Sequence, residues 1–428
     1  AIAAIAISGI TRSQVLVDAA SQPVAPAILW NDTRASETLP ALAARCPPDH
    51  PETAGLNAFH PLARLFWLKS MHPDHFARVR HVLDPKDYLN LRLTGIAASD
   101  PVSLARLLAA TAPAPSGMTL PDAAGLPATL LPALREPVSV MGRVLATHTG
   151  ALSRLAAVPV ITMANDTWAS VVGLGAMRPG FGYNLSGTTE VLGLVSADPA
   201  MAEGLLTVDW REGLTQLGGP SQSGGDTLAW LLSLLGAADQ NATETLNALL
   251  AAPREADPVI FLPYLQGERV PYWDAALRGA LVGLNRRHRA VDLAYAVMEG
   301  VGFLNRIVLE RAEAATGCPV SEIRFGGGGA ANPRWSQIKA DILNRSIAVV
   351  EHGEVGLLGA AITAFTAIGR LGSLAEAQAR LVRVRRVYAP EAQSHAKYDR
   401  LFALFRDTEA ALAPISRKLA GWRGNERA

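Results

Sequence analysis

Asn165 and Asp166 directly follow an apolar stretch, Val158–Met163, that predicts a buried strand, and a helical pattern then runs to about Ala176. In open α/β sheets, ligands bind outside the carboxyl ends of the strands. A carboxylate at such a junction can accept a proton from a substrate hydroxyl, which makes Asp166 a candidate general base. An aspartate that only caps the helix fits the same position, and from the sequence alone the cap is the more common role.

Two glycine-containing segments could bind phosphate. The first, Ser186–Glu190, reads Ser-Gly-Thr-Thr-Glu between two predicted strands, and its backbone N–H groups and hydroxyls suit phosphate oxygens. An ordinary hairpin would have the same composition. The second, Phe325–Asn332, contains four consecutive glycines between a predicted strand and a predicted helix, which would let a ligand approach the backbone closely.

The glycine run also supports a competing interpretation. Gly326, Gly328 and Ala331 match the spacing of a dinucleotide-binding fingerprint, and Glu351 ends the next predicted strand 20 residues after Ala331. A nicotinamide- or flavin-dependent oxidoreductase is therefore an alternative function class. That fingerprint normally occupies the first strand-to-helix turn of its fold, whereas this segment lies late in the chain. The Walker pattern is absent, because Gly-Lys-Ser/Thr occurs nowhere in the sequence.

Trp30, Asp32 and Arg34 lie within five residues of one another. An aromatic plane can pack on the C–H face of a sugar, while a carboxylate and a guanidinium can bind its hydroxyls. This group therefore suits a polyhydroxylated ligand. A surface ion pair at the end of a strand explains the same residues equally well.

Composition limits the function classes. The 428 residues suggest two or three domains, and 39 basic against 38 acidic side chains argue against a broad nucleic-acid surface. No apolar run reaches the length of a membrane span. Cys46 and Cys318 fit neither a disulfide framework nor a zinc pattern, so we expect a reducing compartment, the cytoplasm. Neither a nucleic acid nor a membrane is expected as a partner.

The elements that must position these residues fall into two halves. Each half begins with strands and continues with helices and further strands, which predicts two α/β domains of related plan with a cleft between them. The break at Arg178–Gly182 divides the chain into residues 1–178 and 179–428. The first half is expected to hold strands at Ile2–Ser8, Gln14–Asp18 and Pro26–Trp30 and an irregular excursion over Ala112–Leu134. In the second half, a repeat of apolar residues every three or four positions predicts the longest helix over Asp292–Ala315.

From Ile5 to its C-terminal helix, the sequence resembles the FGGY carbohydrate kinases. The strongest match is the family's C-terminal signature, Gly279–Leu284 followed by Asp292–Glu299, and the segment Gly267–Asp274 before it is also typical. The earlier signature occurs as Phe59–Leu68, with Arg64 where the family usually has lysine, and Asp87–Gly95 is another landmark.

The resemblance implies a fold of two ribonuclease H-like domains, of the actin and sugar-kinase ATPase type, that close over a sugar and ATP. It assigns the catalytic base to Asp166 and implies direct phosphoryl transfer with Mg²⁺-ATP, with no metal ligand assigned. The implied nucleotide-binding residues are Gly187, Thr188, Thr189, Gly225, Gly327, Gly328 and Asn332. The candidate sugar-binding residues are Thr11, Arg12, Trp30, Asp32, Arg34 and Asn165. The dinucleotide interpretation then loses most of its weight, because the same glycine turn is the family's adenosine site.

Two departures from the family pattern bear on activity and substrate. Family members open with a strand and a Gly-Thr phosphate turn whose aspartate serves Mg²⁺-ATP, and no such segment precedes Ile2. The chain therefore looks truncated, and as written it is expected to be inactive. After Gly9, xylulose kinases carry Gln-Met-His and glycerol kinases carry Gln-Arg-Glu, whereas this chain has Ile10, Thr11 and Arg12.

The substrate expectation rests on the remainder of the chain, which looks closest to the xylulose-kinase branch. We therefore expect a ketopentose such as xylulose, with another polyol, another pentulose or a sugar acid as alternatives. Arg12 could bind a hydroxyl cluster or a carboxylate, or it could pair with Asp32 and only shape the site. A non-catalytic sugar-binding relative is the other alternative class. A homodimer is kept as a candidate assembly, although the sequence shows no interface.

Overall fold

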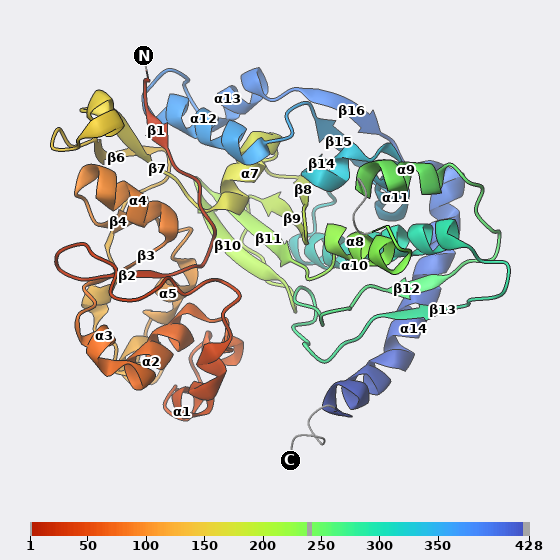
Figure 1. The fold of residues 1–428 in the computed structure, drawn as a ribbon, viewed down its shortest axis with the longest axis horizontal. Coiled ribbons are helices and arrows are strands. Elements are labelled where there is room, and N and C mark those ends of the chain that lie inside the picture. Colours follow the sequence, from red (N-terminus) through yellow and green to blue (C-terminus); the bar gives the residue numbers. More distant parts are fainter. Residues whose placement is uncertain (1, 238–241, 423–428) are drawn as a thin grey trace. The chain divides into compact units, whose positions relative to one another are not determined.

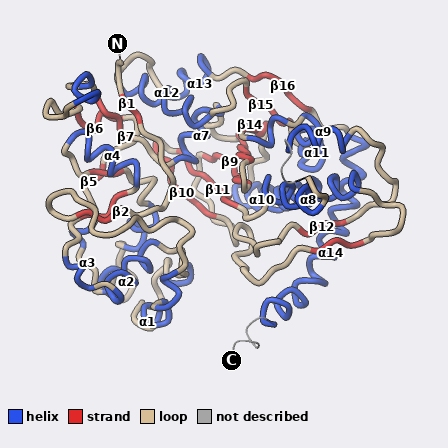
Figure 2. Tube along the Cα trace, viewed as in Figure 1, coloured by secondary structure: helices blue, strands red, loops and turns tan. Residues whose placement is uncertain are grey.

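The computed structural model describes residues 2–237 and 242–422, which form two compact units (Figures 1 and 2). Unit 1 comprises Ala1–Gly173 and Gly356–Gln378, and unit 2 comprises Leu174–Val355 and Ala379–Ala428. The predicted boundary near residue 178 lies close to the first crossing. The return of Gly356–Gln378 to unit 1 was not predicted. It depends on Gly359, because a Cβ there would collide with the Ala169 carbonyl oxygen, and no sequence pattern reports such a helix contact.

The central sheet of unit 1 is built on β7 (Pro159–Thr162), which confirms the predicted strand before Asp166. β1 (Ile5–Ala6) pairs with β7 in parallel, and β6 (Ser139–Arg143) pairs with it antiparallel. The carboxyl end of β7 leads directly into α7 (Asp166–Leu174). The two smaller sheets of the described part of unit 1 pair β2 (Val15–Val17) with β3 (His81–Leu83), and β4 (Ala98–Ser99) with β5 (Ala133–Leu134).

Several helices of unit 1 pack on α2 (Pro61–Met71), whose residues from Pro61 to Leu68 are all buried. The His60 ring accepts a hydrogen bond from the Leu62 N–H at 3.1 Å, and Pro61 occupies the first turn, so the helix has a clear start. The other helices of this unit are α1 (Leu39–Ala43), α3 (Pro73–Ala77), α4 (Pro85–Thr94), α5 (Ala105–Ala110), α6 (Leu120–Ala124), α12 (Val355–Ala367) and most of α13 (Leu374–Leu381).

Two expectations for unit 1 were wrong. Ala112–Leu134 is not irregular throughout: it contains α6, where the Thr119 and Asp122 side chains form a reciprocal capping box. The proline and glycine content hid this short helix. Pro26–Trp30 is not a strand, because only Ile28 pairs, through an isolated bridge to Gln14. Pro26 has no N–H to extend that pairing.

Unit 2 contains a seven-stranded sheet in the order β10-β11-β9-β8-β14-β15-β16. β8, β9, β11 and β10 are paired antiparallel in that order, and β14 and β15 continue the sheet parallel to β8. This arrangement is the ribonuclease H-like plan that was predicted. The strands are β8 (Phe181–Ser186), β9 (Glu190–Ser196), β10 (Leu206–Arg211), β11 (Leu214–Pro220), β14 (Glu322–Gly326), β15 (Ser346–Val350) and β16 (Val384–Tyr388).

Two helices, α10 (Ala290–Thr316) and α11 (Pro333–Leu343), pack on this sheet and on each other (Figure 1). α10 is 27 residues long and α14 (Ala392–Trp422) is 31, so the prediction that the former is the longest helix was wrong. Pro414 lies inside α14, and a proline normally signals a helix end. The remaining described elements of this unit are α8 (Gly225–Leu234), α9 (Ala242–Leu250), β12 (Ile260–Leu262) and β13 (Ala280–Val282).

Sequence patterns missed the edge strands β10 and β16. β10 alternates apolar with polar residues, whereas β16 contains two adjacent arginines and is exposed at four of its five positions. Charged side chains are common on edge strands, and they weaken the apolar signal on which strand prediction depends. Within residues 2–237 and 242–422, no helix has both the length and the apolar character that crossing a bilayer requires.

Candidate active site

At the start of α7, the roles of helix cap and candidate general base fall to two different residues. Asn165 is the helix cap: its Oδ1 accepts a hydrogen bond from the Trp168 N–H at 2.9 Å. Asp166 is therefore not needed as the cap. Its Oδ1 accepts a hydrogen bond from the Thr167 N–H at 2.8 Å, and the Thr11 N–H also donates to its carboxylate. The structure thus leaves the Asp166 carboxylate at the carboxyl end of β7, where a general base was expected.

Burial raises the pKa of Asp166 above its usual range. The two backbone N–H donors and the nearby positive charge of Arg12 oppose that increase but do not cancel it. A general base works best when its pKa approaches the working pH, so an increase favours proton transfer from a sugar hydroxyl. Thr11 and Arg12, which are far from Asp166 in sequence, are brought close to it here.

Arg64 holds the segments that carry two candidate sugar-binding residues. It is 1% exposed, and its guanidinium donates to three carbonyl oxygens: Arg12 at 2.7 Å, Trp30 at 2.6 Å and Phe59 at 2.9 Å. Arg12 has a φ of +54°, which is uncommon for a residue with a side chain. The bond from Arg64 to its carbonyl helps to hold this conformation. Burial lowers the pKa of Arg64 to about 10, so it stays protonated at neutral pH.

Asp32 and Arg34 pair with each other, at 2.5 Å between Oδ2 and Nη2. The hydrogen bond from Arg34 lowers the pKa of Asp32. The Arg34 guanidinium also lies over the Trp67 ring, 4.4 Å from its centre. The Asp32 side chain is 16% exposed and that of Arg34 is 52% exposed. The two residues therefore form the surface ion pair that the sequence left open as an alternative. Binding of a hydroxyl by either residue stays a prediction.

A buried charged cluster beside the base was missed by sequence reasoning. Lys86 Nζ donates to Asp87 and to Asp100, both at 2.7 Å, and all three side chains are at most 1% exposed. Asp84 is also buried, and its Oδ2 has no hydrogen-bond partner among the described residues. Burial raises the pKa of Asp84 well above its usual range, and the negative charges of the other carboxylates, Asp166 included, add to this effect. The run Asp84-Pro-Lys-Asp looks like an exposed charged turn in sequence, so no local pattern marks it as buried.

A second buried network supports the start of α2. His60 Nε2 lies 3.2 Å from Glu52, which also accepts from Arg106 at 2.9 Å. Burial is the main cause that lowers the pKa of His60 to about 4, so the ring is neutral at physiological pH. Hydrogen bonds and charges from His60 and Arg106 outweigh burial at Glu52 and lower its pKa to about 2. Glu52 therefore carries the charge that Arg106 neutralises.

In unit 2, the first predicted phosphate segment is the hairpin turn between β8 and β9. Ser186 pairs with Glu190, and the Gly187 N–H bonds to the Thr189 carbonyl at 3.0 Å. Gly187 and Thr188 are exposed at the tip. The segment is thus a hairpin, as the plainer interpretation expected, and its tip still presents backbone and hydroxyl groups to a ligand.

A loop that leads into α8 is bonded to this turn. The Gly225 N–H donates to the Gly187 carbonyl at 2.9 Å, and the Asp226 N–H donates to the Thr188 carbonyl at 3.1 Å. A Cβ on Gly225 would lie 2.6 Å from the Gly187 oxygen. Only a glycine permits this approach, so Gly225 has a structural role beside the turn, and its contact with a nucleotide stays a prediction.

The four-glycine segment meets the same turn from β14. Gly327 has a φ of +87°, and a Cβ there would collide with the Ser186 carbonyl oxygen. A Cβ on Gly329 would collide with the Ser186 hydroxyl, which is buried and has no hydrogen-bond partner in the described part of the chain. Gly328 is exposed. The loop at Gly225 and the four-glycine segment therefore both meet the turn Ser186–Thr189.

Asn332 is placed differently from its predicted role. It is 5% exposed and caps α11, where its Oδ1 accepts from the Arg334 N–H at 2.9 Å and the Trp335 N–H at 3.1 Å. Its Nδ2 donates to Asn247 at 3.2 Å. The Asn332 side chain is thus engaged in positioning the helix, and direct contact with a nucleotide stays a prediction.

This convergence fits a polyphosphate. Exposed backbone at Gly187 and Gly328, the two threonine hydroxyls and the absence of side chains at the glycines leave room and donors for phosphate oxygens. The buried Ser186 hydroxyl is a further polar group at the base of the cradle. The donor set suits the phosphates of ATP, which would bring Mg²⁺ with them.

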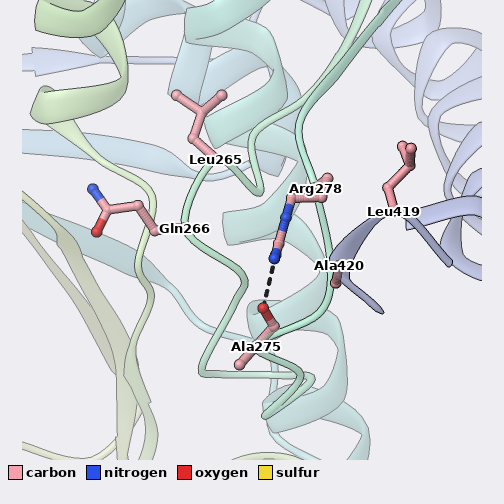
Figure 3. A pocket seen from close by; sticks show the side chains of 6 residues that line it. All are labelled: Leu265, Gln266, Ala275, Arg278, Leu419 and Ala420. Atoms are coloured by element: carbon pink, nitrogen blue, oxygen red, sulfur yellow. Dashed lines mark hydrogen bonds between the residues drawn. The ribbon is translucent and has the colours of Figure 1, made fainter. Parts of the chain in front are cut away.

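Two hollows of about 470 Å³ each lie nearby in unit 2. Figure 3 shows the first, where the Arg278 guanidinium turns back to the Ala275 carbonyl at 2.8 Å. It is lined by Leu265, Gln266, Ala275, Arg278, Leu419 and Ala420. The second is lined by Gln222, Asp226, Thr227, Ala229, Trp230, Ser233, Pro263, Leu265 and Gln266. Neither is lined by a predicted site residue, although the second adjoins Gly225 through Asp226.

Comparison with known proteins assigns both halves. Residues 1–173 match the N-terminal domain of the FGGY family of carbohydrate kinases, and residues 182–368 match its C-terminal domain. The chain belongs to the FGGY family. It is therefore a carbohydrate kinase with the two-domain sugar-kinase fold, as the resemblance implied. The oxidoreductase alternative is not supported, because the glycine run lies in the C-terminal domain of a kinase.

Individual relatives agree with this assignment. The chain is 32% identical over 418 residues to the xylulose kinase of Escherichia coli K12, covering 96% of this chain and 85% of that protein. Among solved structures, a gluconate kinase from Lactobacillus acidophilus superimposes with a TM-score of 0.87 at 26% identity, covering 98% of this chain and 86% of that one. A ligand-bound xylulose kinase from the same organism gives 0.86 at 25% identity, with the same coverage.

Proposed function

We propose that this FGGY kinase transfers the γ-phosphoryl group of ATP to a hydroxyl of a ketopentose, with xylulose as the first candidate. The observation that carries the proposal is the carboxylate of Asp166. Asn165 caps α7 in its place, so Asp166 remains available at the end of β7 with a raised pKa. The xylulose kinases among the relatives support the choice of sugar.

In unit 1, Asp166 accepts the proton of the sugar hydroxyl as its oxygen bonds to phosphorus. The backbone N–H groups of Thr11 and Thr167 orient the carboxylate, since both donate to it. Arg12 supplies a positive charge beside the base. Asn165, Trp30, Asp32 and Arg34 are proposed to contact the other hydroxyls. When a sugar that lacks one of these hydroxyls binds, the polar atom of the protein that would pair with it is left without a partner. This cost is the basis of selectivity.

In unit 2, the turn Gly187–Thr189 with Gly225, Gly327 and Gly328 would hold the phosphates, and Asn332 would position α11 behind them. When bound, Mg²⁺-ATP supplies the phosphoryl group and a metal that neutralises charge on its oxygens. The protein's own contribution is positioning and fixed dipoles. Because both cysteines are free thiols, we also propose a reducing compartment, the cytoplasm. A homodimer stays a prediction.

The test is ADP release by the full-length protein with Mg²⁺-ATP across xylulose, ribulose, glycerol and gluconate. We expect xylulose to give the highest kcat/KM. The Asp166→Asn variant should lose roughly 10²- to 10⁴-fold in kcat while it still binds ATP, because it lacks only the proton acceptor. Asp74→Asn, which changes an exposed aspartate of α3, is the matched control and should keep full activity.

Two results would contradict the proposal. If Asp166→Asn kept its rate of sugar phosphorylation, Asp166 would not be the base. If gluconate were preferred, the substrate assignment would be wrong and Arg12 would be the residue that binds a sugar carboxylate. That second outcome is a specific alternative, because Arg12 lies beside the base and a gluconate kinase is among the structural neighbours.

A further inference from the structure

Glu268 is a buried carboxylate that binds four donors in unit 2. It is 2% exposed. Its Oε1 accepts from the Gln222 N–H at 2.5 Å and from the Arg269 N–H at 2.8 Å. Its Oε2 lies 2.8 Å from the Ser223 hydroxyl and 3.3 Å from the Ser221 hydroxyl. One side chain therefore joins the loop at 221–223 to its own segment.

We propose that Glu268 is a positioning residue for nucleotide binding: its ionised carboxylate holds the loop 221–225 in the conformation that supports the phosphate turn. This inference rests on the proposed function, because it assumes that the turn Gly187–Thr189 binds the phosphates. Glu268 itself does not need to contact the nucleotide.

The connection from the loop to the turn consists of backbone hydrogen bonds. The Ser221 N–H donates to the Glu190 carbonyl at 2.9 Å, and the Glu190 N–H donates to the Ser223 carbonyl at 3.2 Å. The bonds from Gly225 to Gly187 and from Asp226 to Thr188, described above, continue the same ladder. A Cβ on Gly224 would lie 2.6 Å from Thr189, so the two segments are in close contact. A shift of the loop must therefore move the turn.

The serine hydroxyls can accommodate either protonation state of Glu268. Each hydroxyl has one hydrogen, and each has a second acceptor in reach: the Pro263 carbonyl at 2.9 Å for Ser223, and the Ser223 carbonyl at 2.9 Å for Ser221. With Glu268 ionised, both hydroxyls donate to Oε2. With Glu268 protonated, its hydrogen can be donated to the Ser223 oxygen, while Ser223 donates to Pro263. The attraction between the loop and a full negative charge is then lost.

The surroundings of Glu268 place this change near neutral pH. Burial, acting against the four donors and Arg269, raises the pKa of Glu268 to about 7. Arg269 also donates to the Ser221 carbonyl at 2.7 Å, so it holds the same loop. The other titratable groups around it are Tyr264 with its partner Glu409, Asp274 across an isolated bridge, and Asp226 and Glu190 on the loop and turn.

The test measures binding of ADP, with Mg²⁺ present, by calorimetry from pH 5.5 to 8.5 in the wild type and in Glu268→Gln. The amide can donate to Ser223 as the protonated acid does, so the variant should behave at every pH like the wild type at low pH. We expect Glu268→Gln to bind ADP about fivefold more weakly at pH 8.5, a change that corresponds to about 1 kcal/mol of binding free energy. The difference between the two proteins should vanish near pH 5.5, and titration of the nucleotide itself cancels in that difference.

Glu299→Gln is the matched control, because Glu299, on α10, is a second buried glutamate of unit 2. Its carboxylate is bonded to Arg254, which lies between α9 and β12, and to Tyr398 of α14. It should keep its ADP affinity at all pH values. If Glu268→Gln does not fold, Ser223→Ala removes the 2.8 Å bond and should weaken binding at pH 8.5 in the same direction. Equal affinity of wild type and Glu268→Gln at pH 8.5 would refute the inference. Failure of the wild type to bind ADP at all would refute the proposed function instead.

Discussion

Arg64→Lys should weaken sugar binding without removing any group that touches the sugar. Arg64 reaches three carbonyl oxygens on separate segments, at 2.6–2.9 Å, from two different nitrogens. A lysine keeps the positive charge but concentrates its donors at one atom on a shorter side chain. It can retain one of these bonds well, and the carbonyls of the other two segments lose their partner.

The size of the effect follows from the lost bonds. Each hydrogen bond from a charged donor contributes about 1.5–3 kcal/mol, and two are lost. Allowing for partial relaxation, we expect the free energy of unfolding to fall by about 3 kcal/mol. Arg12, at a φ of +54°, loses the bond that holds its carbonyl and should leave its position beside Asp166. If about 1.4 kcal/mol of this appears in binding, KM for the sugar rises tenfold.

The assay is urea denaturation together with steady-state kinetics in which the sugar and ATP are varied separately. Arg78→Lys is the control, because the Arg78 side chain is 57% exposed and pairs with Asp18 at a distance of 3.4 Å. That variant should change the free energy of unfolding by less than about 0.5 kcal/mol. An unchanged sugar KM in Arg64→Lys, or an equal rise in the KM for ATP, would refute the reasoning that Arg64 positions the sugar segments specifically.

Two further predictions concern the glycine cradle and buried His60. Gly327→Ala should raise the KM for ATP and destabilise unit 2 by more than the control Gly213→Ala. Both glycines have a positive φ, but only a Cβ at 327 collides with Ser186. Denaturation and ATP kinetics of the two variants test this, and equal effects would contradict a close approach of Gly327 to Ser186. The folded-state pKa of His60, about 4, lies below its unfolded value of 6.5, so stability is lost as pH falls from 6.5 to 4. Between pH 6.5 and 4, this group changes the free energy of unfolding by about 3 kcal/mol, and His60→Asn should remove that change. If the free energy of unfolding of the variant fell with pH as steeply as that of the wild type, the prediction would be contradicted.

Sequence patterns predicted the fold where local signals were strong. β7 and α7 were found because an apolar run ends at a polar pair, and the helix predicted after the four glycines is α11. The long-range return of Gly356–Gln378 to unit 1 was not predictable in this way. The contact that marks this return is between Gly359 and the Ala169 carbonyl oxygen, and nothing in the sequence distinguishes Gly359 from other glycines.

In the candidate site, too, local patterns identified some residues, while the roles of others depend on contacts between distant segments. Asp166 was predicted because its position at a strand end has chemical meaning, but which residue caps α7 was decided only by the bond between Asn165 and Trp168. Arg64 was noticed only as a departure from lysine in the family pattern. Its role requires knowing that three segments meet at one guanidinium. Asp84 and Lys86 were missed, because burial of a charged run depends on what covers it.

The two halves of the site thus differ in what sequence can reveal. The proposed nucleotide half uses backbone geometry, so its positions are marked by glycine, and two glycine segments, at Gly225 and at Gly327, meet the turn Ser186–Thr189. The proposed sugar half uses side chains on segments held by a distant partner, Arg64. A local pattern can suggest such side chains, as it did for Trp30, but it does not reveal the partner that holds the segment. Substrate preference in this chain should therefore respond to residues such as Arg64 that support the Arg12 and Trp30 segments from below. A change at such a residue alters which hydroxyls the site can pair while Asp166 and the phosphate turn stay intact.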